Sequence, residues 1–203
     1  MNLIEATRNG RIEGDVVRVV SDDPGAPVLG RAQKRGTPAS VLEPFELGAR
    51  LSPEAERNLA TIVAGDRPDL VALCGFMRLL SAPFLERAHI PILNVHPSLL
   101  PAFRGLNAQR QAIDAGVRVT GATVHFVDAG MDSGPILLQA PLEVRAGESA
   151  EELAERLLPI EHALYVDAIR LIQAGAVRRE GRVVQIDSAL AARLLAAGIQ
   201  GRN

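Results

Sequence analysis

The sequence has few of the residues that several common classes of function require. Its 203 residues include no Trp, one Tyr, five Phe and one Cys, and its net charge is -2. Without a basic excess or an aromatic platform, the chain is not expected to bind nucleic acid. A single cysteine excludes an internal disulfide and a cysteine-cluster zinc site. Cys74 ends an apolar run, so we expect it in the core.

Long apolar segments are also absent. No run reaches the length needed to cross a membrane, and Met1 is followed by polar and charged residues rather than a signal segment. We therefore expect a cytoplasmic protein with no membrane partner. Its length predicts one domain over residues 1–203, in which 176–203 form a C-terminal hairpin and helix. The sequence leaves open whether the chain is a monomer or a homodimer.

Hydrophobic periodicity alternates between strand and helix along the chain. Strands are predicted at 14–21, 37–42, 70–74, 92–96, 119–128 and 136–143, and helices at 1–8, 26–35, 53–64, 83–88, 106–115, 149–174 and 188–197. Pro159 is expected to kink the longest helix. The pattern predicts the α/β class: an open, mostly parallel, twisted Rossmann-like sheet with helices on both faces. Residues 119–128 and 136–143 are candidates for an antiparallel hairpin at its edge.

One predicted strand ends in two polar side chains. Asn94 and His96 close the apolar run that starts at Ile92, and Pro97 and Ser98 break the backbone after them. Residues two apart on a strand point to the same face. An amide donor and an imidazole on one spot suit carbonyl chemistry, because one can hold an oxyanion and the other can move a proton. The alternative is a structural histidine before a capped turn.

A glycine-rich loop offers a partner for this histidine. Asp132 lies between Gly130 and Gly134, and loops at strand ends of an open sheet converge on one crevice. A carboxylate beside His96 would keep the imidazole protonated and oriented. His125 lies in the middle of a strand, where a supporting or core role is expected. The basic cluster Arg178, Arg179 and Arg182 is expected to be a solvated face.

Three motifs resemble the phosphoribosylglycinamide formyltransferase family of folate-dependent transformylases. They are residues 94–101 (NVHPSLLP), 121–127 (GATVHFV) and 131–136 (MDSGPI), in this order. The resemblance extends from residue 2 to about residue 186 and implies a formyltransferase-type fold. It implies transfer of a formyl group from 10-formyltetrahydrofolate to the amine of 5-phosphoribosylglycinamide in purine biosynthesis. In this reaction Asn94 and His96 stabilise the oxyanion and relay a proton, and Asp132 raises the His96 pKa.

The resemblance also implies which residues bind the two small-molecule substrates. The folate side is assigned to Met77, Arg78, Leu79, Leu80, Asn94, Asp128, Ala129, Gly130, Met131 and Asp132. The glycinamide side is assigned to Pro97, Leu158, Pro159, Ile160 and Glu161. No metal is implied, and the four histidines, His89, His96, His125 and His162, show no metal-ligand spacing.

The sequence departs from the family at its start and near residue 104. The family begins with a strand and a Gly/Ser/Asn-rich turn that binds the substrate phosphate, whereas this chain begins inside the following helix. We therefore expect the N-terminal strand to be missing from the sheet, through either a start recorded too late or a true truncation. Arg104 and Asn107 stand where the family often has Pro and His, and Arg50 is a candidate for an Arg commonly found near Leu51.

Two rival functions share the same three residues. A formyltetrahydrofolate deformylase would use water as the acceptor, although such enzymes usually carry an additional regulatory domain. A truncated folate-binding relative would bind the donor with little activity. The chain has no basic C-terminal domain of the kind that methionyl-tRNA formyltransferases use for tRNA.

Overall fold

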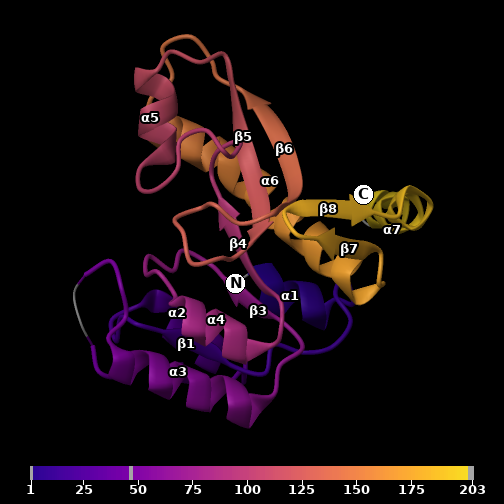
Figure 1. Ribbon diagram of the computed structural model, residues 1–203. Coiled ribbons are helices and arrows are strands. Elements are labelled where there is room, and N and C mark those ends of the chain that lie inside the picture. The colour runs from indigo at the N-terminus through magenta and orange to yellow at the C-terminus, as the bar shows by residue number, and fades with distance from the viewer. Residues whose placement is uncertain (1, 46–47, 201–203) are drawn as a thin grey trace.

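Helices and strands alternate over the part of the chain that the structure describes, residues 2–45 and 48–200 of a computed structural model (Figure 1). The helices are α1 (Asn2–Arg8), α2 (Pro27–Gln33), α3 (Pro53–Asp66), α4 (Ala82–Ala88), α5 (Ala108–Asp114), α6 (Ala150–Gln173) and α7 (Ser188–Gln200). The strands are β1 (Val19–Ser21), β2 (Ala39–Val41), β3 (Val71–Leu73), β4 (Ile92–His96), β5 (Val119–Phe126), β6 (Ile136–Glu143), β7 (Val177–Glu180) and β8 (Val183–Ile186). The α/β class is confirmed. Met1 of the predicted first helix and residues 201–203 of the predicted domain lie outside the described residues.

The main sheet has four strands in the order β3-β4-β5-β6. β3 and β4 are parallel, whereas the β4–β5 and β5–β6 pairs are antiparallel. The predicted hairpin of β5 and β6 is therefore confirmed, but antiparallel pairing starts one strand earlier than predicted. β1 and β2 form a separate parallel pair, and β7 and β8 form a separate hairpin.

Two strands are shorter than their apolar runs predict. β1 has three residues instead of the predicted 14–21, and β3 has three residues, all half-buried, instead of 70–74. Cys74 follows β3 and is exposed, so the prediction that it lies in the core is wrong. The reason is that β3, within the described residues, pairs only with β4, and no neighbouring strand covers its other edge.

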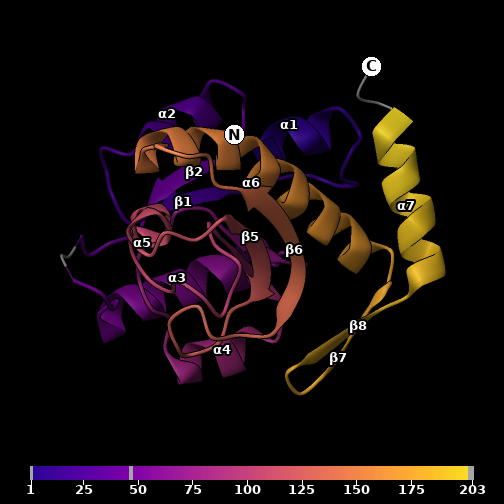
Figure 2. The ribbon, with the colours of Figure 1, turned by 90° about the horizontal axis from the view of Figure 1, so that it is seen from above.

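Helices cover both faces of the main sheet, as Figure 2 shows. On one face α6 and α1 pack on a cluster that includes Ala6, Leu93, Val124 and Val166. On the other face α3 and α4 pack on a cluster that includes Phe84 and Ile92. Consecutive residues of β4 thus point to opposite faces, as strand geometry requires. This alternation decides to which face the polar residues of β4 point.

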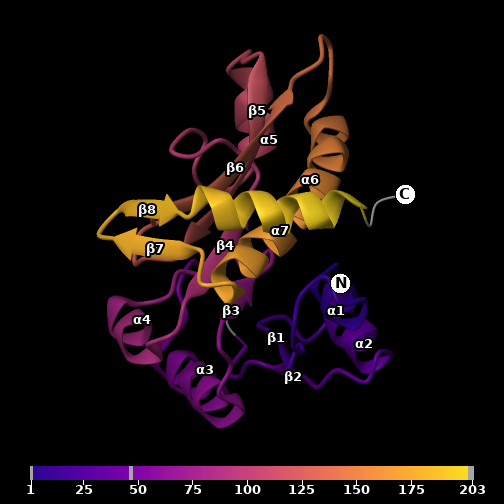
Figure 3. The ribbon, with the colours of Figure 1, turned by 90° about the vertical axis from the view of Figure 1, so that its right-hand side faces the viewer.

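A capping box begins α6. Ser149 Oγ accepts a hydrogen bond from the Glu152 N–H at 3.2 Å, and the Glu152 carboxylate accepts one from the Ser149 N–H at 2.8 Å. The helix continues through Pro159 as one element. Figure 3 shows α7 crossing beside α6, where Arg170 Nη2 donates to the Leu194 carbonyl at 2.7 Å. Among the described residues no helix combines the length and the apolar character needed to cross a membrane.

One buried hydroxyl ties α6 to the two parallel strands. The Tyr165 hydroxyl is 3.0 Å from the Leu73 carbonyl oxygen and 2.9 Å from that of Leu93, and the residue is 3% exposed. Tyr165→Phe removes this donor, so the Leu73 and Leu93 carbonyl oxygens lose it as a hydrogen-bond partner. We expect the free energy of unfolding in urea to fall by about 1–3 kcal/mol. Thr61→Val, which removes an exposed helix hydroxyl, is the control and should change it by less than about 0.5 kcal/mol.

Candidate active site

The polar side chains of β4 point away from α6. Leu93 and Val95 pack toward α6, so Asn94 and His96 face the other side of the sheet. β4 pairs antiparallel with β5, and the register sets Asn94 opposite His125 and His96 opposite Thr123. The strand therefore fixes two functional side chains on one face, and β5 brings a second histidine to the same place.

His96 is held between two acceptors. Its Nδ1 atom is 3.3 Å from Asp132 Oδ2, and its Nε2 atom is 2.8 Å from the Phe103 carbonyl oxygen. A carboxylate and a carbonyl can only accept, so both contacts are hydrogen bonds when the imidazole carries two protons. The side chain is 6% exposed, which limits competition from water. Asp132 therefore occupies the Nδ1 side of the ring and the Phe103 carbonyl occupies the Nε2 side.

Asp132 is the centre of the site's electrostatics. Burial opposes ionisation of this carboxyl, but the two neighbouring imidazoles, His125 and His96, and the hydrogen bond from the Gly105 N–H together outweigh it. The pKa of Asp132 is therefore held below its ordinary value. The Gly105 N–H donates to Oδ2 at 2.9 Å, and the Asp132 backbone is in the left-handed region at φ 45°. Such a backbone is uncommon for a residue other than Gly, and the loop has to maintain it.

His125 lies in the site as a supporting group. Its Nδ1 atom is 3.0 Å from the Phe126 carbonyl oxygen, so this nitrogen carries the proton. Its Nε2 atom is then free to accept from Asn94 Nδ2, 3.3 Å away, and lies 3.7 Å from Asp132 Oδ1. His125 therefore orients the Asn94 amide. Strand alternation in the sequence indicates to which face of β5 His125 points. Its position beside Asn94 follows from the antiparallel pairing of β4 with β5.

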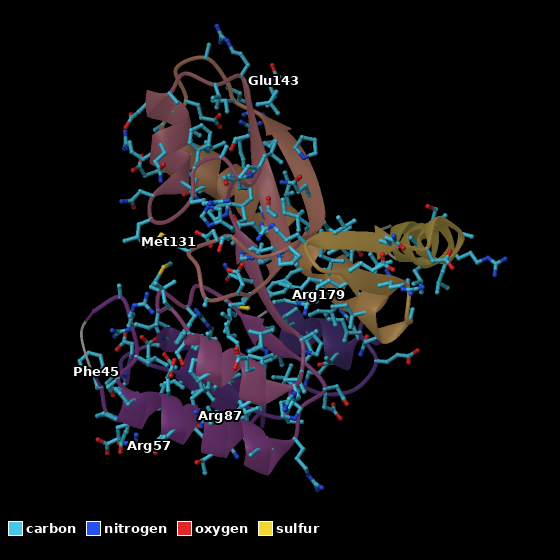
Figure 4. The ribbon with its side chains drawn as sticks, in the orientation of Figure 1. Phe45, Arg57, Arg87, Met131, Glu143 and Arg179 are labelled. Carbon is cyan, nitrogen blue, oxygen red and sulfur yellow. The ribbon has the colours of Figure 1, made fainter. Side chains whose placement is uncertain are left out.

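The loop after β5 carries Asp132 and half of the residues assigned to the folate side. Asp128 Oδ1 accepts hydrogen bonds from the Gly130 N–H at 3.1 Å and from Ser133 Oγ at 2.6 Å, which closes the loop on itself. Ala129, Gly130 and Met131 are exposed at its tip. Figure 4 shows Met131 on this loop, which lies between the main sheet and the part of the chain that carries Phe45.

The segment 77–80 supplies less than the sequence suggested. The Arg78 side chain is occupied, because Nε donates to Asp22 Oδ2 at 2.7 Å and Nη1 to the Gly48 carbonyl at 2.5 Å. The Leu79 N–H donates to the Ala49 carbonyl at 2.8 Å. Leu80 is 2% exposed and belongs to the core, whereas Met77 is 66% exposed. Met77 is therefore the most exposed residue of this segment, and Arg78 and Leu79 are half-buried.

The residues assigned to the glycinamide side lie in two places. Pro97 follows His96 and is half-buried, whereas Leu158, Pro159, Ile160 and Glu161 lie on α6. Their role in binding the glycinamide substrate stays a prediction. Burial raises the pKa of Glu161, which marks it as a carboxyl in an unusually apolar position.

The contacts of Phe103 and Gly105 with the site were not predicted from the sequence, which singled out only Arg104 and Asn107 of segment 103–107. This segment supplies the Phe103 carbonyl to His96 and the Gly105 N–H to Asp132. Phe103, Gly105 and Asn107 all have positive φ, at 54°, 80° and 58°. A loop built from such residues has no periodicity from which to predict it. Among the described residues, no group of three His, Cys, Asp or Glu side chains is placed to hold a metal ion.

The lowered pKa of Asp132 predicts how stability depends on pH. Because the folded-state pKa lies below the unfolded value, the ionised carboxylate stabilises the fold above about pH 4 and ceases to do so as pH falls through the folded pKa. The difference in unfolding free energy between the wild type and Asp132→Asn should therefore shrink between about pH 6 and pH 3. Urea titrations across this range measure it, and a difference independent of pH would contradict the assignment.

Comparisons with known proteins show the family of the chain. The family model described as Formyl transferase matches residues 1–169. The chain is 39% identical over 176 residues to the trifunctional purine biosynthetic protein adenosine-3 of Gallus gallus, which covers 87% of this chain and 17% of that protein. It is 36% identical over 176 residues to the Homo sapiens protein of the same name, again covering 87% and 17%. The chain thus spans about one sixth of the length of these curated relatives.

Solved structures resemble the chain over most of its length. Glycinamide ribonucleotide transformylase 1 from Symbiobacterium toebii superimposes with a TM-score of 0.84 and 46% identity, covering 91% of this chain and 86% of that one. Phosphoribosylglycinamide formyltransferase from Anaplasma phagocytophilum superimposes with a TM-score of 0.81 and 35% identity, covering 92% and 89%. The chain belongs to the formyl transferase family.

Proposed function

We propose that this chain transfers a formyl group from 10-formyltetrahydrofolate to the amine of 5-phosphoribosylglycinamide. The observation that carries the proposal is the arrangement of Asn94 and His96 on one face of β4 with Asp132 3.3 Å from His96. The names of the relatives support the choice of acceptor, because they include glycinamide ribonucleotide transformylase and phosphoribosylglycinamide formyltransferase.

In the proposed reaction the amine nitrogen attacks the formyl carbon and the carbonyl electron pair moves onto oxygen. Asn94 and the His96 imidazolium stabilise this oxyanion, and a preorganised donor of this kind contributes about 10²- to 10³-fold in rate. Collapse of the intermediate breaks the bond to the folate nitrogen, which takes up the proton that the amine loses. His96 relays this proton, while Asp132 keeps the imidazole charged and oriented. No metal has a role in these steps.

In this proposal, the hydrogen bonds of Asn94 and His96 determine which of their N–H groups are available to substrate. One N–H of the Asn94 amide is directed to His125, so the other is available to an oxyanion. His96 Nε2 donates to the Phe103 carbonyl, and this bond has to be replaced by one to substrate. Substrate binding therefore involves a displacement of segment 103–107 relative to His96. The exposed loop tip 129–131 and Met77 provide the surface on the folate side.

The test is a formyl-transfer assay with the purified chain and both substrates. Transfer is measured by mass spectrometry of the formylated glycinamide product and by loss of the donor. Product formation that requires the glycinamide substrate supports the proposal. Formate release without that acceptor would instead show a deformylase, and donor binding without turnover would show a folate-binding relative.

A further inference from the structure

The three arginines of the C-terminal hairpin are exposed, as predicted, but two of them also contact the main sheet or the loop after β5. Arg178 fits that expectation, because it is exposed and pairs with Glu180 of its own strand at 3.2 Å. Arg179 instead has its guanidinium carbon 5.3 Å from the centroid of the Phe126 ring, at the end of β5. Arg182 reaches the loop that follows β5. Figure 4 shows Arg179 where the hairpin meets the main sheet.

Arg182 contacts both ends of the loop that carries Asp132. Its Nη2 atom donates to the Ser133 carbonyl at 2.5 Å, and its Nη1 atom is 3.9 Å from Asp128 Oδ2. Asp128 closes the loop through its own bonds to Gly130 and Ser133. The guanidinium thus adds a contact from the hairpin to a loop that also receives the Gly105 N–H at Asp132.

The hairpin is a suitable support for this contact. Val184 and Ile186 of β8 pack against the core cluster on the α6 face of the sheet, so the strand beside Arg182 is fixed by apolar burial. Ser133, the residue that Arg182 holds, directly follows Asp132. Because Asp132 is in the left-handed region, its backbone relaxes if the flanking residue is released.

We propose that Arg182 is a positioning residue for formyl transfer, which acts by holding Ser133 and thereby the Asp132 carboxylate against His96. The proposal rests on the proposed function. Arg182 itself is 70% exposed and touches neither His96 nor Asp132, so solvent screening keeps its effect moderate. Its role is mechanical: it fixes the position of a carboxylate that the reaction requires.

The first test compares Arg182→Ala with the matched control Arg178→Ala. Arg182→Ala should lower kcat/KM for formyl transfer by about 3- to 10-fold, mainly through kcat, because misplacing a catalytic group weakens the transition state more than binding. Arg182→Lys keeps one charged donor and should recover part of the loss. Arg178→Ala should behave as wild type. Equal activity of Arg182→Ala and wild type would overturn the proposal while leaving the proposed function intact.

The second test separates positioning from general stability. In an Asp132→Asn background, Arg182→Ala should cause no further loss of the residual activity, since the carboxylate that it positions is gone. An undiminished loss in that background would overturn the proposal.

A third measurement does not depend on activity. Amide hydrogen exchange of residues 128–134 should accelerate in Arg182→Ala and not in Arg178→Ala. Unchanged exchange would overturn the proposal even in a chain without transferase activity. Absence of transfer by the wild type would contradict the proposed function alone.

Discussion

Asp132→Asn is expected to lower kcat/KM for formyl transfer by about 10²- to 10⁴-fold without unfolding the chain. The amide has nearly the shape of the carboxylate and keeps an oxygen that can accept from the Gly105 N–H. It lacks the negative charge that lies 3.3 Å from His96 Nδ1. The Gly105 N–H and His96 Nδ1 contact the same oxygen, Oδ2, so an amide that keeps its oxygen there still accepts from both but no longer offsets the charge of the imidazole. His96→Ala, which removes the proton carrier, should cause a loss of at least the same order.

The measurement is steady-state formyl transfer over a range of pH, with circular dichroism to show that each variant is folded. Asp66→Asn is the matched control, because Asp66 is also an ion-paired carboxyl with a lowered pKa but contacts Arg18 rather than the site. This control should keep wild-type kcat/KM. If Asp132→Asn stayed within about 3-fold of wild type, the imidazolium mechanism would be wrong.

The centre of the site could be predicted because it belongs to periodic elements. The apolar run before Asn94 fixes a strand, and the spacing of two residues sets Asn94 and His96 on one face. The capping box at Ser149 and the β5–β6 hairpin are likewise local signals that the structure contains. Such features depend on residues close in sequence, so no knowledge of tertiary packing is needed.

The rest of the site depends on contacts between distant segments. The Phe103 carbonyl and the Gly105 N–H are backbone groups. Almost every residue type has such groups, so their roles have no signature in the sequence. Arg182 contacts Ser133 across 49 positions, and a basic residue on a hairpin gives no indication of this. The prediction for Cys74 was wrong because its apolar run predicts burial, whereas β3 pairs along one edge only among the residues that the structure describes.

Gly134→Ala is expected to lower the free energy of unfolding by about 1–3 kcal/mol and formyl transfer by about 10²-fold. A Cβ at this position would lie 1.8 Å from the Phe126 carbonyl oxygen and 3.3 Å from the Asp128 N atom. These are backbone atoms at the end of β5, where the Phe126 N–H is bonded to the Pro135 carbonyl at 2.9 Å. They cannot turn away as a side chain would, so the base of the loop has to separate from the strand, and Asp132 moves with it.

Gly30→Ala is the matched control for the added methyl group. Gly30 lies in α2, where a Cβ would meet nothing within 4 Å, so the same substitution should leave activity unchanged and stability equal or up to about 1 kcal/mol higher. Urea unfolding and formyl-transfer rates compare the two variants directly. A Gly134→Ala variant with wild-type stability would show that the loop base can shift freely. The position of Asp132 would then depend on the contacts of Arg182, Gly105 and Asp128 rather than on the close approach at Gly134.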